Sequence, residues 1–417
     1  MCRYLLKIIF LFFFVFQLEI FSQVEIKSLK VYSNNDETSF PIINLLDKEN
    51  FLSIEFDVLA KEEPNLSIVF RPCDSNWNEY ENPFLFNPLY DKELNLWFDR
   101  LPINLVGANY HYYGKFPNNN VQFTTSTKWK FFISNNQNRN IIYAEGKFYV
   151  IQPEVKLNVS TKREAMQGDY GDLAILGRTI SIKTSFTLPD SLFQNNVIKV
   201  EIIKNRMINQ PIIIDRKNFT ESNFYEWDAA KSFSFIARNI KPGNEYRQTD
   251  TRNVSKYIPY NVDARFGEFD VSDLFTKRKN DINGASLLMN WRNENSDYLN
   301  VRFRLKPPEN ITKPIFLVGA FNDWKVLPEY EMYDDNGIMN LTIQLKRGLY
   351  DYQYVVADIQ NDKIINEDWY ILEGNFFETR NEYHIFLFYE AQEKGGYEKI
   401  IGYKKIDGVL WKKLKWE

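Results

Sequence analysis

Short runs in which apolar and polar residues alternate follow one another along most of the chain. Examples are FLSIEFDVLA (51–60), NLSIVFRP (65–72), VQFTTSTKWKFFIS (121–134) and IIYAEGKFYVIQP (141–153). A period of two is typical of strands that bury one face and expose the other, and turn-forming residues separate the runs. Helical periodicity never extends far enough to predict a long helix. The pattern therefore predicts an all-β protein.

Proline residues divide this pattern into units. Pro153 follows one strand, and Pro307 with Pro308 makes a second stop, because proline lacks the N–H that a central strand donates. A chain of 417 residues with this pattern is most simply a row of sandwiches of about 100 residues each. We therefore predict tandem Ig-like/E-set β-sandwich domains. The expected bounds are 23–153 for the N-terminal sandwich, 154–306 for the middle one, 307–391 for the third and 392–417 for a C-terminal strand or tail.

The first residues have the pattern of a secretory signal peptide. Two basic residues precede an apolar run at 8–16, and Glu19 interrupts that run well before the length of about 20 residues that a membrane anchor needs. We expect residues 1–22 to be removed on export. Cys2 leaves with them, so Cys73 is then the lone cysteine, and packing must stabilise the exported chain without an internal disulfide.

Composition and charge argue against several functions. A net charge of −4 and a pI near 5.6 provide no basic excess for nucleic acid. The two histidines, His111 and His384, lie among strand-forming residues without the spacing of a metal site. Neither a Gly-rich phosphate loop nor a Gly-x-Ser-x-Gly elbow occurs, so we predict no cofactor and no metal. The acids at 334–337 are either calcium ligands or, more simply, part of a hairpin turn.

The stretch GNEYRQTD (243–250) concentrates charge within a β pattern. It has no neighbouring histidine, cysteine or serine nucleophile, so a catalytic role is the least favoured interpretation. Strand alternation places Glu245 and Arg247 on one face. The sequence therefore predicts that Glu245, Arg247 and Asp250 form a partly buried ion network that fixes a loop, with contact to a partner protein as the alternative.

The third unit contains FLVGAFNDW (316–324) and GLYDYQYVV (348–356). These motifs resemble the small sandwich of glycogen- and starch-binding modules. The resemblance implies that Trp324 stacks on a sugar face, which a flat indole can do. Gln353 stands where that family commonly has a lysine, and the strand lacks the second tryptophan that is expected after it. The resemblance therefore supports the fold and does not favour a glycan ligand.

Five separated motifs, in order, resemble the plug proteins of the bacterial type IX secretion system. They are RPCDSNWNEY (71–80), NYHYYGKFPNN (109–119), GNEYRQTD (243–250), the segment 281–305 and TRNEYHIFLFYE (379–390). Together they span most of the chain after the signal peptide. Within these motifs the resemblance marks six residues as structural or partner-contacting: Trp77, His111, Glu245, Tyr246, Arg247 and Asp250.

The resemblance implies a non-enzymatic periplasmic protein associated with the outer membrane. It would seal the periplasmic end of an outer-membrane translocon barrel of the SprA type while no cargo passes, and it would contact the membrane only through that partner. Two other functions remain open. One is a periplasmic or secreted carbohydrate-binding accessory protein, motivated by Trp324, and the other is a secreted enzyme that uses loop carboxylates.

Overall fold

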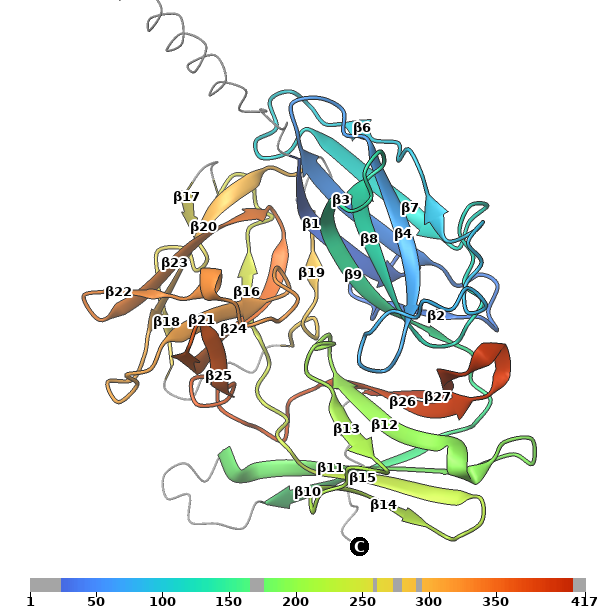
Figure 1. Cartoon of the computed structure of the whole chain (residues 1–417). Coiled ribbons are helices and arrows are strands. Elements are labelled where there is room, and N and C mark those ends of the chain that lie inside the picture. Colours follow the sequence, from blue (N-terminus) through green and yellow to red (C-terminus); the bar gives the residue numbers. More distant parts are fainter. Residues whose placement is uncertain (1–23, 166–175, 258–260, 273–279, 290–294, 408–417) are drawn as a thin grey trace, which may run out of the picture.

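The computed structural model describes residues 24–165, 176–257, 261–272, 280–289 and 295–407. The predicted signal peptide at 1–22 lies outside them. The described residues form strands and turns, with short 3-10 turns η2 (Gln194–Asn196), η3 (Pro328–Tyr330) and η4 (Glu393–Gly395) and no α-helix. Figure 1 shows the strands as three β-sandwiches packed around a common centre. The prediction of an all-β protein with tandem sandwich domains is confirmed.

The N-terminal sandwich contains every described strand up to residue 151. Its first sheet has the order β1 (Glu25–Ser33), β3 (Leu52–Leu59), β7 (Tyr110–Phe116) and β6 (Asp99–Arg100). Its second sheet has the order β2 (Ile42–Asn44), β9 (Ile142–Ile151), β8 (Lys128–Asn135), β4 (Leu66–Cys73) and β5 (Lys92–Glu93). β2 and β9 pair parallel, while the other pairs in these two sheets are antiparallel.

Strand β3 shows how the alternating sequence fixes the packing of this sandwich. Leu52, Ile54, Phe56 and Val58 point into the core and are at most 1% exposed. They face aromatic residues of the opposite sheet, including Phe70, Phe131 and Trp129. Since apolar burial is the main driving force of folding, this one face specifies the register of the strand.

The middle sandwich combines strands from two distant parts of the chain. One sheet has the order β10 (Asn158–Ala165), β11 (Arg178–Thr187), β15 (Ser232–Ile240) and β14 (Asn223–Trp227). The other has the order β13 (Ile212–Asp215), β12 (Val197–Lys204), β26 (Glu382–Ala391) and β27 (Tyr397–Asp407). Their shared core includes Ile182 and Val200 from the first part and Leu387 and Ile401 from the second.

The third sandwich is inserted between β15 and β26. In one sheet, β24 (Leu349–Gln360) pairs with β16 (Arg247–Asp250), β19 (Ser286–Leu287), β21 (Ile315–Gly319) and β25 (Lys363–Asp368). In the other, β20 (Tyr298–Lys306) pairs with β17 (Asn261–Asp263), β18 (Asp270–Val271) and β23 (Ile338–Lys346), and β23 pairs with β22 (Tyr333–Asp335). β17 and β18 pair parallel with β20.

The strand pairing corrects the linear division of the second half of the chain. The bounds 307–391 and 392–417 predict β26 in the third unit and β27 in a tail, but both strands complete the middle sandwich beside β12. The bounds 154–306 likewise predict β16 to β20 in the middle unit, whereas they belong to the third sandwich. Alternation marks a strand without specifying its distant partner, and this is the physical reason for the difference.

Candidate functional site

The stretch GNEYRQTD is the connection from the middle sandwich to the third. It leaves β15 and enters β16, and the segment 373–381 returns beside it to β26. Gly243 joins the two: its N–H donates to Asn375 Oδ1 at 2.8 Å, and its carbonyl accepts from Thr379 Oγ1 at 2.8 Å. Its φ of 81° lies in the left-handed region that favours glycine. The segment that enters the third sandwich and the segment that leaves it are therefore hydrogen-bonded to each other.

Glu245 holds this connection to the returning segment, and Tyr246 holds it to the third sandwich. One carboxylate oxygen of Glu245 accepts from the backbone N–H of Arg380 at 2.8 Å, and the Tyr246 N–H donates to Asp281. The Tyr246 ring lies 4.2 Å from that of Trp324, centroid to centroid, and burial raises its pKa well above the usual value. Both residues act within the molecule.

Arg247 is 3% exposed and lies in a buried ionic cluster. Its guanidinium pairs with Glu373 at 2.9 Å and with Asp270 at 3.2 Å. Tyr352 and Tyr354 donate to the same oxygen of Asp270 at 2.7 and 2.8 Å. Burial alone lowers the pKa of Arg247, but the two carboxylates outweigh that effect and raise it. The guanidinium is thus held charged in the interior.

These partners differ from the ion network that the sequence predicts. The acids that pair with Arg247 come from positions 270 and 373, far along the chain, while Asp250 pairs with Arg252 at 2.7 Å and Glu245 accepts from backbone N–H groups. The stretch lies at the corner between the middle and third sandwiches, and its side chains are held there by residues from distant parts of the chain.

Trp77 lies where the N-terminal sandwich meets the middle one. Its ring meets the edge of Tyr149 at 5.4 Å, and the ammonium of Lys128 lies 4.7 Å from its centroid. Lys128 also pairs with Glu201 of β12 at 2.8 Å, and both side chains are at most 1% exposed. Tyr149 stacks on Phe386 of β26 at 4.3 Å. An aromatic core with one buried ion pair thus joins these two sandwiches.

His111 lies where the N-terminal sandwich meets the third one. Its Nδ1 is 2.7 Å from Asp57 Oδ1, and Asp57 also accepts from Tyr298 at 2.9 Å and from Lys346 at 2.7 Å. Burial alone raises the pKa of Asp57, but hydrogen bonding to His111 and the charge of Lys346 lower it overall. Asp57 therefore connects the two sandwiches as an ionised acceptor.

Trp324 does not offer its ring to a sugar. The side chain is 2% exposed, its Nε1 donates to the Gly284 carbonyl at 2.8 Å, and Tyr246 packs against it. The predicted glycan-stacking role needs an open indole face, so this role is contradicted by the burial. Here the indole anchors the junction between the middle and third sandwiches.

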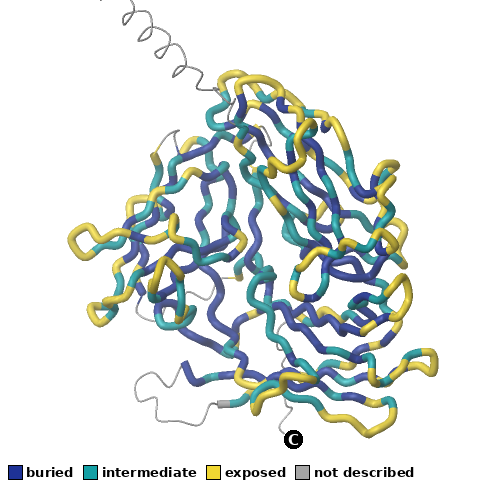
Figure 2. The backbone as a smooth tube through the Cα atoms, viewed as in Figure 1, coloured by how far each residue is buried: buried dark blue, intermediate teal, exposed yellow. Residues whose placement is uncertain are grey.

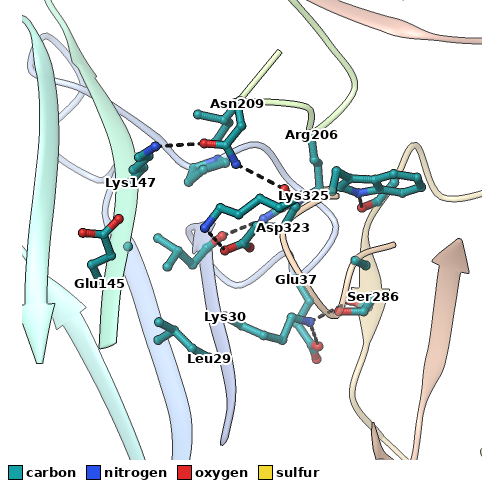
Figure 3. Close-up of a pocket in the computed structure, with 17 residues that line it drawn as sticks. Leu29, Lys30, Glu37, Glu145, Lys147, Arg206, Asn209, Ser286, Asp323 and Lys325 are labelled. Carbon is teal, nitrogen blue, oxygen red and sulfur yellow. Dashed lines mark hydrogen bonds and ion pairs between the residues drawn. The ribbon is translucent and has the colours of Figure 1, made fainter. Parts of the chain in front are cut away.

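A small polar cavity of about 90 Å³ lies where the three sandwiches meet (Figure 3). Lys147 of β9 donates to Asn209 at 2.8 Å, and Asn209 donates to the Asp323 carbonyl at 3.2 Å, so three sandwiches are bridged in sequence. Arg206 donates to the Val31 carbonyl at 2.8 Å across the same space. Polar groups of all three sandwiches therefore meet around this cavity and join them.

The described residues hold no group of three or more His, Cys, Asp or Glu side chains placed to bind a metal ion. Asn336 and Gly337, with φ of 54° and 83°, form the turn between β22 and β23, and the Gly337 N–H donates to Asp334. Nor does any helix among the described residues have the length and apolarity to span a membrane.

Sequence reasoning missed the buried charges at the junctions, Asp57, Lys128 and Glu201, and the two that pair with Arg247, which are Asp270 and Glu373. Glu201 could have been suspected, because it stands between Val200 and Ile202 in a strand rich in branched apolar residues, whereas Lys128 is the first residue of its strand and gave a weaker signal. Asp57 gave no such signal. It falls on the polar face of β3, and only the tertiary structure shows that another domain covers that face.

The fold and its junctions define a class: an all-β protein of three sandwiches whose buried polar groups join domains. Residues 26–152 match the model of the family described as type 9 secretion system plug protein 1st domain. The N-terminal sandwich is thus similar to the first domain of the type IX secretion plug proteins, and the match supports a role in type IX secretion.

Two further comparisons concern the whole chain. A crystal structure of a hypothetical protein from Parabacteroides merdae ATCC 43184 has a TM-score of 0.74 to this chain at 19% identity, covering 94% of this chain and 100% of that one. At that identity the likeness shows the fold alone. The sequence matches no curated protein.

Proposed function

We propose that the protein is a non-enzymatic periplasmic plug that occludes the periplasmic end of the outer-membrane type IX translocon barrel, of the SprA type, when no cargo is in transit. The family match over residues 26–152 carries this proposal. The sequence supports it through an export signal pattern at 1–22. A barrel that passes folded cargo must be closed at rest, and a protein that contributes bulk and shape, without chemistry, meets that need.

The junctions between the sandwiches support a mechanism of steric occlusion. A plug has to keep its shape under contact with a large partner, so its domains should not move independently. The buried pair of Lys128 and Glu201, the stacked Tyr149 and Phe386, and the hub at Asp57 hold the three sandwiches as a block. Trp324, which packs against Tyr246 of the connecting stretch, serves the same block at the third junction.

Affinity purification tests the proposal directly. The protein, tagged at its C-terminus, is recovered from detergent-solubilised outer membranes, and the co-purifying proteins are identified by mass spectrometry. We expect one very large β-barrel protein that is absent when an unrelated periplasmic protein carries the same tag. Recovery of the tagged protein alone, even after mild crosslinking, would overturn the proposal.

A further inference from the structure

A cleft of about 720 Å³ lies between the middle and third sandwiches, beside the stretch that connects them. One wall comes from β12 to β15 of the middle sandwich, and the other comes from β24, β25 and the residues that follow β25. The connecting stretch that lines the cleft is buried at 242–247 (Figure 2). Ligand sites in proteins usually measure about 300–1,000 Å³, so the cleft has room for more than a single ion.

Three basic side chains line the cleft from the side of the middle sandwich: Lys204 at the end of β12, Arg238 of β15 and Lys241 just after β15. Among the described residues, no carboxylate forms an ion pair with any of them. Lys204 donates to the Pro242 carbonyl at 3.4 Å. The ammoniums of Lys204 and Lys241 lie 5.5 and 4.9 Å from the ring centroid of Tyr370. Two cations therefore lie beside one aromatic ring without a counter-charge.

The carboxylates of the opposite wall are held by other groups. Glu367 accepts from the indole N–H of Trp369 at 2.8 Å, and Asp368 accepts from two backbone N–H groups at 2.9 and 3.0 Å. Glu373 pairs with Arg247 at 2.9 Å. These acids line the same cleft, but their hydrogen bonds point them to their own loop and to the buried ionic cluster rather than to the lysines.

Lys204 shows the electrostatic consequence of this arrangement. Desolvation lowers its pKa to about 8, and no carboxylate of the described chain opposes that shift. At the buried Lys128, by contrast, Glu201 opposes it. An ammonium that is withdrawn from water costs free energy unless an anion accompanies it. A carboxylate of a bound ligand would supply that anion, so the cleft favours a negatively charged ligand.

Side-chain amides make up much of the remaining polar lining of the cleft. They belong to Gln210, Asn223, Asn239, Asn244, Gln353 and Asn366. Gln353, for example, donates one hydrogen bond to the Trp369 carbonyl at 3.3 Å, and an amide has a second N–H and two acceptor lone pairs besides. Donors and acceptors of this kind match the N–H and carbonyl groups of a peptide backbone, whereas a free inorganic anion offers only acceptors. Cations and amides together therefore fit an acidic peptide.

We propose that the cleft binds an acidic peptide segment of another protein. Lys204 and Lys241 hold its carboxylates, and the side-chain amides pair with its backbone. The inference goes beyond the proposed function, because occlusion of a barrel does not require a peptide site. It therefore stands or falls separately from the plug.

Fluorescence anisotropy with labelled synthetic peptides tests the proposal. The probe is acetyl-Glu-Ser-Glu-Ser-Glu-Ser-amide, and the same peptide with glutamine in place of glutamate is its uncharged match. We expect the acidic peptide to bind at least about ten-fold more tightly than the uncharged one, because charge-assisted hydrogen bonds are the stronger ones. Lys204→Met with Lys241→Met should remove that difference. Lys217→Met is the control, since Lys217 is exposed on the middle sandwich outside the cleft.

Amine labelling locates the bound peptide. Acetic anhydride modifies accessible lysines, and mass spectrometry of the digested protein gives the extent at each. Saturating acidic peptide should protect Lys204 and Lys241 and leave Lys217 as reactive as before. Lys204→Arg should keep the affinity, because the charge remains. The melting temperature of Lys204→Met should not fall, since the substitution removes an ammonium that has no carboxylate partner in the described chain.

The other outcomes overturn the inference. Absence of binding to the wild type at millimolar peptide would do so, as would equal binding of the uncharged peptide or unprotected lysines. Citrate that displaces the acidic peptide at equal concentration would assign the cleft to free anions instead. If the double variant melts at a lower temperature, Lys241→Met alone decides the matter: wild-type affinity in that variant, without protection of Lys204 in the wild type, contradicts the proposal. None of these results bears on recovery of the barrel protein, so the plug function is tested independently.

Discussion

The pair of Lys128 and Glu201 shows how single residues decide the stability of a domain junction. Both side chains are buried, and burial lowers the pKa of Lys128 while Glu201 opposes that shift. The carbonyl of Ser75 and the hydroxyl of Tyr149 complete the hydrogen bonds of the pair at 2.7 and 2.8 Å. A buried ion pair of this kind contributes little net stability when intact, but removing one partner leaves an uncompensated charge.

We expect Lys128→Met to lower the free energy of unfolding by about 3–5 kcal/mol, because Glu201 would stay buried without a cation. Urea denaturation measures the effect. Adding Glu201→Gln should restore part of the loss, since the amide still accepts from Tyr149. Lys183→Met is the matched control, because its pair with Glu226 is exposed. An unchanged midpoint for Lys128→Met would show that the pair is solvated.

Asp281 and Asp351 give the connection at 243–250 a dependence on pH. Burial, and then repulsion by Asp351, raises the pKa of Asp281 to about 8, and burial raises the pKa of Asp351 to about 7. A carboxyl with a raised pKa binds its proton more tightly in the folded chain than in the unfolded one. Its contribution to stability is therefore present at acid pH and is lost as the pH rises to the folded pKa.

Because these raised pKa values stabilise the folded chain at acid pH, we expect the melting temperature to fall as the pH rises from about 4 to about 8. Asp281→Asn should flatten that dependence, because the uncharged side chain no longer titrates beside Asp351. Melting curves across the range test this, with Asp334→Asn in the exposed hairpin as the control. A slope as steep in Asp281→Asn as in the wild type would contradict the assignment.

At the scale of elements, the sequence predicted the strands better than their partners. β3 and β8 follow from alternation, because each needs one buried face. The pairing of β26 with β12 could not be predicted, since about 180 residues separate them and both read as apolar strands. The candidate site shows the same limit. The sequence singled out the stretch GNEYRQTD, but the acids that pair with Arg247, namely Asp270 and Glu373, are brought to it only by long-range strand pairing.

Strand β27 (Tyr397–Asp407) provides a prediction at this scale. It is the edge strand beside β26, and Ile400 and Ile401 are fully buried in the two cores that it contacts. A chain ending at residue 396 should fail to fold or aggregate, because burial of each such side chain contributes about 1.5–3 kcal/mol and β26 would become an open edge. A chain ending at residue 407 should keep the wild-type melting temperature. Equal solubility and melting of the two would show that β27 is dispensable.

At the scale of the molecule, the two junctions that the N-terminal sandwich makes differ in chemistry. The junction of the N-terminal and middle sandwiches has an aromatic core that includes Phe40, Tyr149 and Phe386. The junction of the N-terminal and third sandwiches is mainly polar and centres on Asp57. Apolar contacts are stable over a wide range of conditions, whereas polar contacts depend on each partner being present. The third sandwich should therefore be the first to lose its contact with the block.

Asp57→Asn tests this order of separation. The amide cannot neutralise Lys346 and has a single acceptor oxygen for Tyr298 and His111, so the contact should weaken by about 1–3 kcal/mol. We expect calorimetry to show an early transition for the third sandwich, followed by a second for the other two. Asp358→Asn is the control, because the ion pair of Asp358 with Lys313 lies in the third sandwich but away from the junction with the N-terminal one. A single transition that shifts as a whole would instead mean that the three sandwiches unfold as one unit, so that the polar junction at Asp57 is no weaker than the aromatic one.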